Sequence, residues 1–247
     1  MPAERSEWRL LLDLALPALD HVFGPPDEGT ARNHTPDWTL GGGTAIMLHI
    51  RHRISHDIDI FVPGTRLKLF TPATNPAAAR ISGRFQWPGH YLKFERPEGE
   101  IDFLSAMLQT KPGFTWSNLK GRPIAVETPE EVIVKKIRFR SHGFTARDAF
   151  DLAAVAAVRP GLDRTLRAET PDALPRLAEA LRILERQGYD ALAKQITPIG
   201  MGVALLPTAL ERARHVVDCA ASNDHHVSSP ARPGPALRPG DRHDGIG

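Results

Sequence analysis

Hydrophobic residues follow two different patterns along the chain, and the change falls near residue 128. Before that point they form short runs bounded by turn residues, as expected of β-strands, at residues 57–62, 84–87, 91–95, 100–104 and 122–126. After it they recur every three or four residues, as in amphipathic helices, over residues 130–142, 146–158, 171–187 and 207–218. We therefore predict a mixed α/β domain over residues 1–127 and a helical domain over residues 128–227.

Smaller signals sharpen this outline at its ends and at its centre. Residues 7–23 have helical spacing, and a short strand at residues 38–40 leads into three glycines and a helix over residues 44–53. Thr128 and Glu131 fit a capping box at the start of the next helix. Residues 228–247 are rich in Pro, Gly, Arg and His with few apolar residues, which predicts a disordered tail.

Composition narrows the class of protein. Apolar residues make up 41% of the chain and charged residues 24%, which is ordinary for a globular protein with a sizeable core. The net charge of +2 argues against a molecule that binds nucleic acid over its whole surface. A single cysteine, Cys219, excludes a disulfide within the chain. With no apolar run long enough for a membrane span and no signal peptide, we expect a cytoplasmic protein that does not contact membranes.

Two aspartates mark the most informative strand. Asp57 and Asp59 stand two residues apart in the run DIDIFV, so their side chains share one face of the predicted strand. Adjacent carboxylates repel each other, and a hard divalent cation such as Mg²⁺ relieves the repulsion by taking oxygen ligands. The alternative is an edge strand with two solvated acids.

A third acid and a glycine turn favour the metal. Asp102 lies among apolar residues in IDFL, so a neighbouring strand can bring its carboxylate to the pair, although it also fits a simple strand-edge acid. Three acids suit metal-dependent phosphoryl transfer, with one of them acting as a base toward the attacking hydroxyl. Gly42, Gly43 and Thr44 stand where a strand becomes a helix, and such a turn brings backbone N–H groups to a phosphate.

These residues carry a resemblance to a known family. The stretch GGGTAIMLHIRHRISHDIDIF resembles the opening motif of the AbiEii/AbiGii-type nucleotidyltransferase toxins, which include the MenT toxins. The family's second motif, a lysine-bearing helix followed by Arg-Asp-X-X-Asp-Leu, is matched by EEVIVKKIRFRSHGFTARDAFDL. The residues that fit the first motif are Gly42, Gly43, Thr44, Ala45, His52, Arg53, Ser55, Asp57, Ile58, Asp59 and Phe61.

The resemblance implies a DNA polymerase β-like fold, a mixed sheet with flanking helices, and places catalysis in residues 1–127. It implies a Mg²⁺-dependent enzyme that moves NMP from an NTP to the 3′ end of tRNA, in a toxin–antitoxin or phage-defence system with a cognate antitoxin. Asp57, Asp59 and Asp102 would hold one or two metal ions. Catalysis would also use Lys136 and Asp148, and the nucleotide would contact Gly42, Gly43, Thr44, Arg53, Ser55 and Lys136.

Several choices stay open at this level. Lys135 is an alternative to Lys136, and Asp151 is an alternative to Asp148. The basic positions on this stretch are also consistent with a solvated helix face. Two other functions compete: transfer onto a small molecule, as in aminoglycoside nucleotidyltransferases, and an inactive binding module. Clustered carboxylates argue against the inactive module, because without a metal they gain nothing from proximity.

Overall fold

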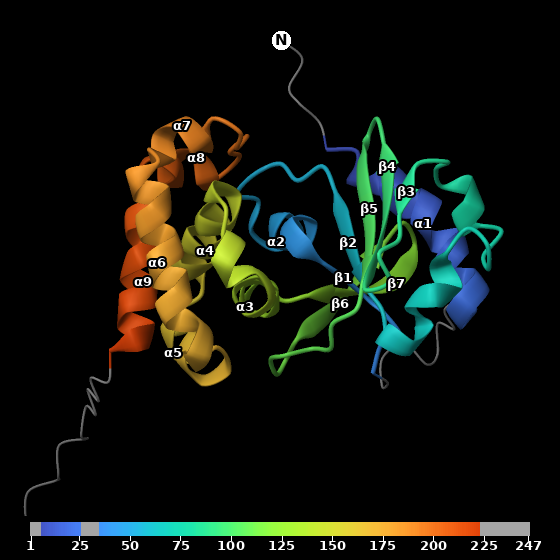
Figure 1. Ribbon diagram of the computed structural model, residues 1–247, viewed down its shortest axis with the longest axis horizontal. Coiled ribbons are helices and arrows are strands. Elements are labelled where there is room, and N and C mark those ends of the chain that lie inside the picture. The colour runs from blue at the N-terminus through green and yellow to red at the C-terminus, as the bar shows by residue number, and fades with distance from the viewer. Residues whose placement is uncertain (1–5, 26–34, 223–247) are drawn as a thin grey trace, which may run out of the picture.

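A mixed β-sheet stands at the centre of the molecule, with helices on both of its faces (Figure 1). The computed structural model describes residues 6–25 and 35–222, so the predicted tail at residues 228–247 lies outside the described residues. The sheet has seven strands in the order β3-β4-β5-β2-β1-β7-β6. The strands are β1 (Thr39–Gly41), β2 (Ile58–Phe61), β3 (Phe85–Gln86), β4 (Tyr91–Arg96), β5 (Gly99–Leu104), β6 (Phe114–Leu119) and β7 (Arg122–Glu127).

Helices dominate the second half of the chain, as the change of period predicts. Helix α1 covers one face of the sheet and α2 lies on the other, while the later helices form a bundle beyond α3 (Figure 1). The α-helices are α1 (Trp8–Phe23), α2 (Gly42–Ile50), α3 (Pro129–Arg140), α4 (Ala146–Val158), α5 (Leu162–Glu169), α6 (Leu174–Arg186), α7 (Tyr189–Ala193), α8 (Gly202–Leu205) and α9 (Ala209–Ala221). The predicted mixed sheet with flanking helices and a helical C-terminal region is thus confirmed.

The central strands are held together by pairing between distant parts of the sequence. Strand β2 pairs with β5 in parallel and with β1 in antiparallel fashion, and β1 pairs with β7 in parallel fashion. Ile58 and Ile60 are fully buried, so the intervening side chain of Asp59 points to the opposite face of the sheet. The order of strands therefore places β2 and β5, the two acid-bearing strands, side by side.

Backbone hydrogen bonds tie the last helices to the turn that follows α2. Ile54 N–H donates to the Thr197 carbonyl, and Ile199 N–H donates to the His52 carbonyl, both at 2.9 Å. Gly202 lies so close to the His52 carbonyl that a Cβ would overlap it. The helical half is therefore built directly into the turn over residues 51–54.

Local sequence signals succeed in part. Thr128 caps α3 by accepting from the Glu131 N–H, and Pro129 occupies the first turn of the helix. The reciprocal half of the predicted capping box is wrong, because the Glu131 carboxylate instead accepts from the backbone N–H groups of Gln109 and Thr110. The complete capping box lies at the next helix, between Thr145 and Asp148.

Candidate active site

One wall of the candidate site is the sheet face on which β2 and β5 carry their acids. Asp59 and Asp102 are direct neighbours in the parallel pairing of these strands. Asp57 precedes the first residue of β2, and its Oδ1 accepts a hydrogen bond of 3.0 Å from the Glu100 N–H. All three predicted acids line the same pocket, which has a volume of about 890 Å³.

The acids on this wall are short of compensating partners. Asp102 Oδ1 is buried and has no hydrogen-bond partner among the described residues. Burial, followed by the Asp59 carboxylate beside it, raises the pKa of Asp102 to about 7. Burial also raises the pKa of Asp59, more than Lys136 and Arg140 lower it. A bound cation would favour the ionised form of both carboxyl groups.

The described residues contain no group of three His, Cys, Asp or Glu side chains arranged to hold a metal ion as they stand. Asp57 is turned toward the backbone of β5 by its hydrogen bond to Glu100, whereas Asp59 and Asp102 stand side by side. The predicted convergence of all three at metal-bridging distance is therefore not seen in this arrangement, and the metal triad stays a prediction.

The glycine turn is required by the acid and the arginine that pack against it. Gly42 has a φ of 64°, and a Cβ there would overlap the Asp59 carboxylate. A Cβ on Gly43 would overlap the Arg53 guanidinium. Thr44 is fully buried, and its hydroxyl donates to the Asp57 carbonyl at 2.5 Å. Gly43 lines the pocket and Thr44 positions Asp57, so the hydroxyl predicted to contact a nucleotide is used within the fold.

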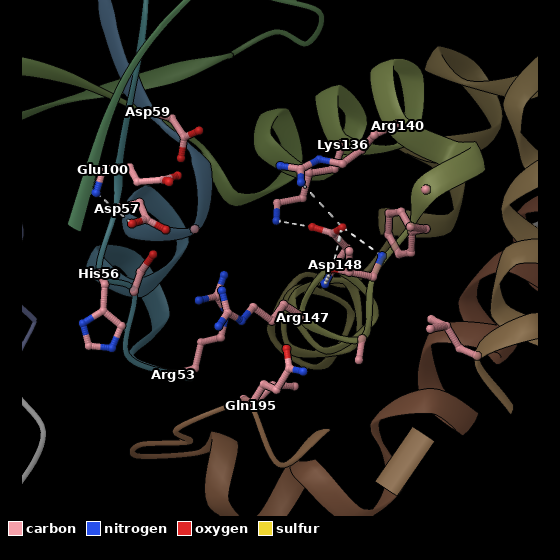
Figure 2. Close-up of a pocket in the computed structure, with 18 of the residues that line it drawn as sticks. Arg53, His56, Asp57, Asp59, Glu100, Lys136, Arg140, Arg147, Asp148 and Gln195 are labelled. Carbon is pink, nitrogen blue, oxygen red and sulfur yellow. Dashed lines mark hydrogen bonds and ion pairs between the residues drawn. The ribbon is translucent and has the colours of Figure 1, made fainter. Parts of the chain in front are cut away.

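The opposite wall consists of α3, α4 and the turn after α2. Figure 2 shows Lys136, Arg140 and Asp148 across the pocket from Asp57 and Asp59. Lys136 Nζ donates to Asp148 Oδ1 at 2.6 Å and to Asp151 Oδ2 at 2.8 Å. Lys136 and Asp148 both line the pocket, whereas Asp151 does not.

Asp151 is the hub of this helix wall. Its fully buried carboxylate accepts from Arg53 Nε at 2.6 Å and from Arg53 Nη2 at 2.9 Å, and His52 Nε2 lies 2.7 Å from its Oδ1. Burial opposes its ionisation, but Arg53 and Lys136 outweigh that cost and hold the pKa of Asp151 well below its usual range. Asp148 is likewise buried, and Lys136 and Arg140 lower its pKa against the effect of burial.

The structure separates the two neighbouring lysines. Lys135 lies outside the pocket, where its ammonium pairs with buried Glu127 and stands 3.8 Å above the Phe61 ring. Lys136 faces the pocket. Of the two candidates, only Lys136 is therefore placed to meet a ligand there.

Several polar pocket residues escaped the sequence analysis, and four of them adjoin the acids or the turn after α2. Lys93 of β4 and Glu100 of β5 belong to the sheet wall, and Gln195 and Thr197 come from the segment after α7. Lys93 is the antiparallel partner of Asp102, and Glu100 stands two residues before Asp102 on the same face, so the strand alternation contained a signal for both. Gln195 and Thr197 lie in an irregular segment with no such pattern.

Comparison with known families decides the class of this site. Residues 29–117 match the family "Nucleotidyl transferase AbiEii toxin, Type IV TA system". This segment is an AbiEii nucleotidyltransferase domain. It contains the glycine turn and all three acids, whereas the second motif, with Lys136 and Asp148, lies beyond it. The match supports nucleotidyl transfer as the activity of this site, as the motifs indicate.

Solved structures with a similar outline share little sequence with this chain. JHP933 from Helicobacter pylori is 14% identical, with a TM-score of 0.46 over 88% of this chain and 94% of its own. The nucleotidyltransferase toxin MenT4 from Mycobacterium tuberculosis is 16% identical, with a TM-score of 0.48 over 88% of this chain and 85% of its own. No curated protein sequence matches the chain. Among the described residues, no helix is long and apolar enough to cross a membrane.

Proposed function

We propose that this AbiEii-type enzyme transfers NMP from an NTP to the 3′ end of an RNA, with tRNA as the acceptor, and that Mg²⁺ supports the reaction. A cognate antitoxin would restrain it. The observation that carries the proposal is that Asp57, Asp59 and Asp102 share one pocket with Arg53 and Lys136. An acid wall opposite a basic wall suits a triphosphate accompanied by a cation.

The acid wall, which consists of Asp57, Asp59 and Asp102, offers the carboxylate ligands that a divalent metal ion needs. Asp102 Oδ1 is buried without a partner, and burial raises the pKa of both Asp59 and Asp102. Such oxygens are suitable ligands for a hard cation, and Asp57, Asp59 and Asp102 would hold it. Once bound, Mg²⁺ supplies positive charge to the phosphoryl oxygens of the triphosphate.

The protein's own residues then have separate tasks. Because Gly43 has no side chain, a phosphate group can approach the N-terminal end of α2, where backbone N–H groups suit an anion. Arg53 and Lys136 line the pocket and are held in place by Asp151, so their positive groups stand ready for the triphosphate. In the reaction an acceptor hydroxyl oxygen forms a bond to the α-phosphorus, pyrophosphate leaves, and the hydroxyl proton passes to a carboxylate. We assign this role to Asp102, whose buried Oδ1 has no hydrogen-bond partner among the described residues.

The rim of the pocket carries the positive charge for the acceptor. Arg140 and Arg147 line the pocket with exposed side chains, whereas Lys135 and Lys136 are buried in ion pairs and cannot form part of a solvated basic face. Arginines at the mouth suit an RNA backbone and would repel a cationic aminoglycoside. We assign the catalytic acids to residues 1–127, and we assign the triphosphate contact of Lys136 and acceptor docking to residues 128–227.

A labelling experiment tests the acceptor and the metal together. The purified full-length chain is incubated with each labelled NTP, with total RNA or an aminoglycoside panel, and with or without Mg²⁺ across a salt series. We expect Mg²⁺-dependent labelling of tRNA that falls steeply as salt rises, because backbone contacts exchange counterions. Labelling of a drug alone, insensitive to salt, would show that the acceptor is a small molecule. Labelling of RNA that persists in EDTA would remove the metal from the proposal.

A further inference from the structure

Lys93 lies on the same face of the sheet as Asp102 and Asp59 and in line with them across the strands. The antiparallel register of β4 and β5 pairs Lys93 with Asp102, and the parallel register of β5 and β2 pairs Asp102 with Asp59. Direct cross-strand partners share one face of a sheet, roughly 5 Å apart. An ammonium and two carboxylates therefore lie side by side across three neighbouring strands.

The ammonium of Lys93 contacts two carboxylates of the pocket, those of Asp102 and Glu100. Its Nζ lies 3.5 Å from Asp102 Oδ2 and also donates to the Glu100 carboxylate. The Lys93 side chain is 23% exposed and the Asp102 side chain 17%, so the contact is partly shielded from water. Despite this neighbour, Asp102 Oδ1 has no hydrogen-bond partner in the described part of the chain. Lys93 thus neutralises Asp102 only in part.

Lys93 differs in this respect from the lysine across the pocket. Lys136 is buried between two carboxylates at 2.6 and 2.8 Å, with a side chain that is 7% exposed. Lys93 has a looser contact to Asp102 and a second partner in Glu100, which faces the same pocket. A lysine ammonium on a flexible four-carbon stem can leave one carboxylate and keep the other.

We propose that Lys93 is a resident counter-ion of the acid wall, which a divalent cation must displace from Asp102 when it binds. The inference rests on the proposed metal dependence and deepens it. A divalent cation on the unpartnered Oδ1 of Asp102 would repel the ammonium that lies at Oδ2 of the same carboxylate, so the two cations compete for Asp102. Glu100 retains the displaced ammonium within the pocket, close to the phosphates that arrive with the nucleotide.

Competition predicts that removal of the Lys93 charge tightens metal binding. We expect the Lys93→Met variant to bind Mn²⁺ about two- to fivefold more tightly than the wild type, since a partly exposed ion pair contributes modestly. Lys93→Arg keeps the charge and should show no tightening. Lys68→Met removes one positive charge from an exposed position outside the pocket and should also leave the affinity unchanged, which controls for net charge.

The measurement is the concentration of free Mn²⁺, followed by electron paramagnetic resonance, in titrations of the full-length, nucleotide-free protein. Asp102→Asn identifies the relevant site, because its Mn²⁺ binding should be lost. Circular dichroism melting checks that each variant folds, and Lys93→Gln supplies a second uncharged side chain. Binding that Asp102→Asn abolishes but that neither uncharged Lys93 variant tightens would overturn the counter-ion inference alone. Absence of Mn²⁺ binding to the wild type would overturn both this inference and the proposed metal dependence.

Discussion

The two walls of the pocket carry similar numbers of charges but treat them differently. On the helix wall, Asp151 accepts from Nε and Nη2 of Arg53 and from Lys136, and its pKa is held well below the ordinary value. On the sheet wall, Asp102 keeps a buried oxygen without a partner in the described chain, and its pKa is raised to about 7. Removing one partner of a buried ion pair destabilises a fold, whereas a buried charge that already lacks a partner is available to a ligand.

The contrast assigns different tasks to chemically identical residues. Aspartates on α4 fix the position of cations that face the pocket, whereas Asp59 on β2 and Asp102 on β5 are left for the cation that we propose. Removal of an acid should therefore have opposite effects on stability at the two walls. Four predictions test this difference.

The largest expected effect is on stability at the helix wall. Asp151→Ala leaves Arg53 and Lys136 without their shared partner, and breaking a buried ion pair in this way costs about 3–5 kcal/mol. Urea denaturation should show this loss, while Asp172→Ala, at an exposed position, should remain within about 0.5 kcal/mol of the wild type. Equal stability of the two variants would show that the buried network does not hold the wall together.

A second prediction concerns activity at the sheet wall. Asp59→Asn should lower nucleotide transfer by about a hundred- to a thousandfold, the size of effect seen when a group that stabilises developing charge is removed. Its melting temperature should equal or exceed that of the wild type, because a carboxylate disfavoured by burial has gone. Transfer is measured with labelled NTP, and Asp172→Asn is the control. An inactive variant that is also unstable would point to a structural task for Asp59.

The pH dependence of stability gives a third, smaller effect. Because the folded-state pKa of Asp102 is raised to about 7, the folded state binds more protons than the unfolded state between about pH 4 and 7. Asp102 therefore lowers the free energy of unfolding as pH rises through this window, by at most about 1.4 kcal/mol per pH unit. Asp148 and Asp151 act in the opposite sense. Their pKa values are lowered in the folded state, so the stability that they contribute is lost as pH falls.

Denaturation of metal-free wild type and Asp102→Asn at several pH values isolates the Asp102 contribution. The variant should gain stability relative to the wild type as pH rises from 4 to 7, and the difference should level off above that range. A difference that is constant across pH would mean that Asp102 is not destabilised by ionisation in the folded protein.

The smallest effect is expected at the rim. Arg147→Gln should reduce the salt dependence of RNA labelling by about one unit of slope on a logarithmic plot, as loss of one phosphate contact does. Arg80→Gln removes the same charge from an exposed position outside the pocket and should leave the slope unchanged. A slope that both variants share with the wild type would place the RNA elsewhere on the surface.

The sequence alone predicted what depends on neighbouring residues. The alternation of DIDIFV identified β2 and the orientation of Asp59, and Thr128 with Pro129 identified the start of α3. These features are local, because strand alternation and helix capping are set by residues a few positions apart.

Pairing across long separations could not be predicted in this way. Nothing in the sequence near Glu131 shows that its carboxylate serves the backbone of Gln109 and Thr110 rather than its own helix. The basic stretch in α3 was equally ambiguous, since the adjacent Lys135 and Lys136 point into two different buried networks. Such choices depend on which distant carboxylate the fold brings near, and only the three-dimensional arrangement decides them.

The backbone link between the turn over residues 51–54 and the segment around Thr197 has a consequence for the order of assembly on the ribosome. The glycine turn and its acids are synthesised early, but Ile54 and His52 gain their hydrogen-bond partners only when Thr197 and Ile199 have left the exit tunnel. Gln195 and Thr197, which also line the pocket, arrive equally late. A nascent chain thus carries its acids without a finished pocket until residues 195–199 have emerged.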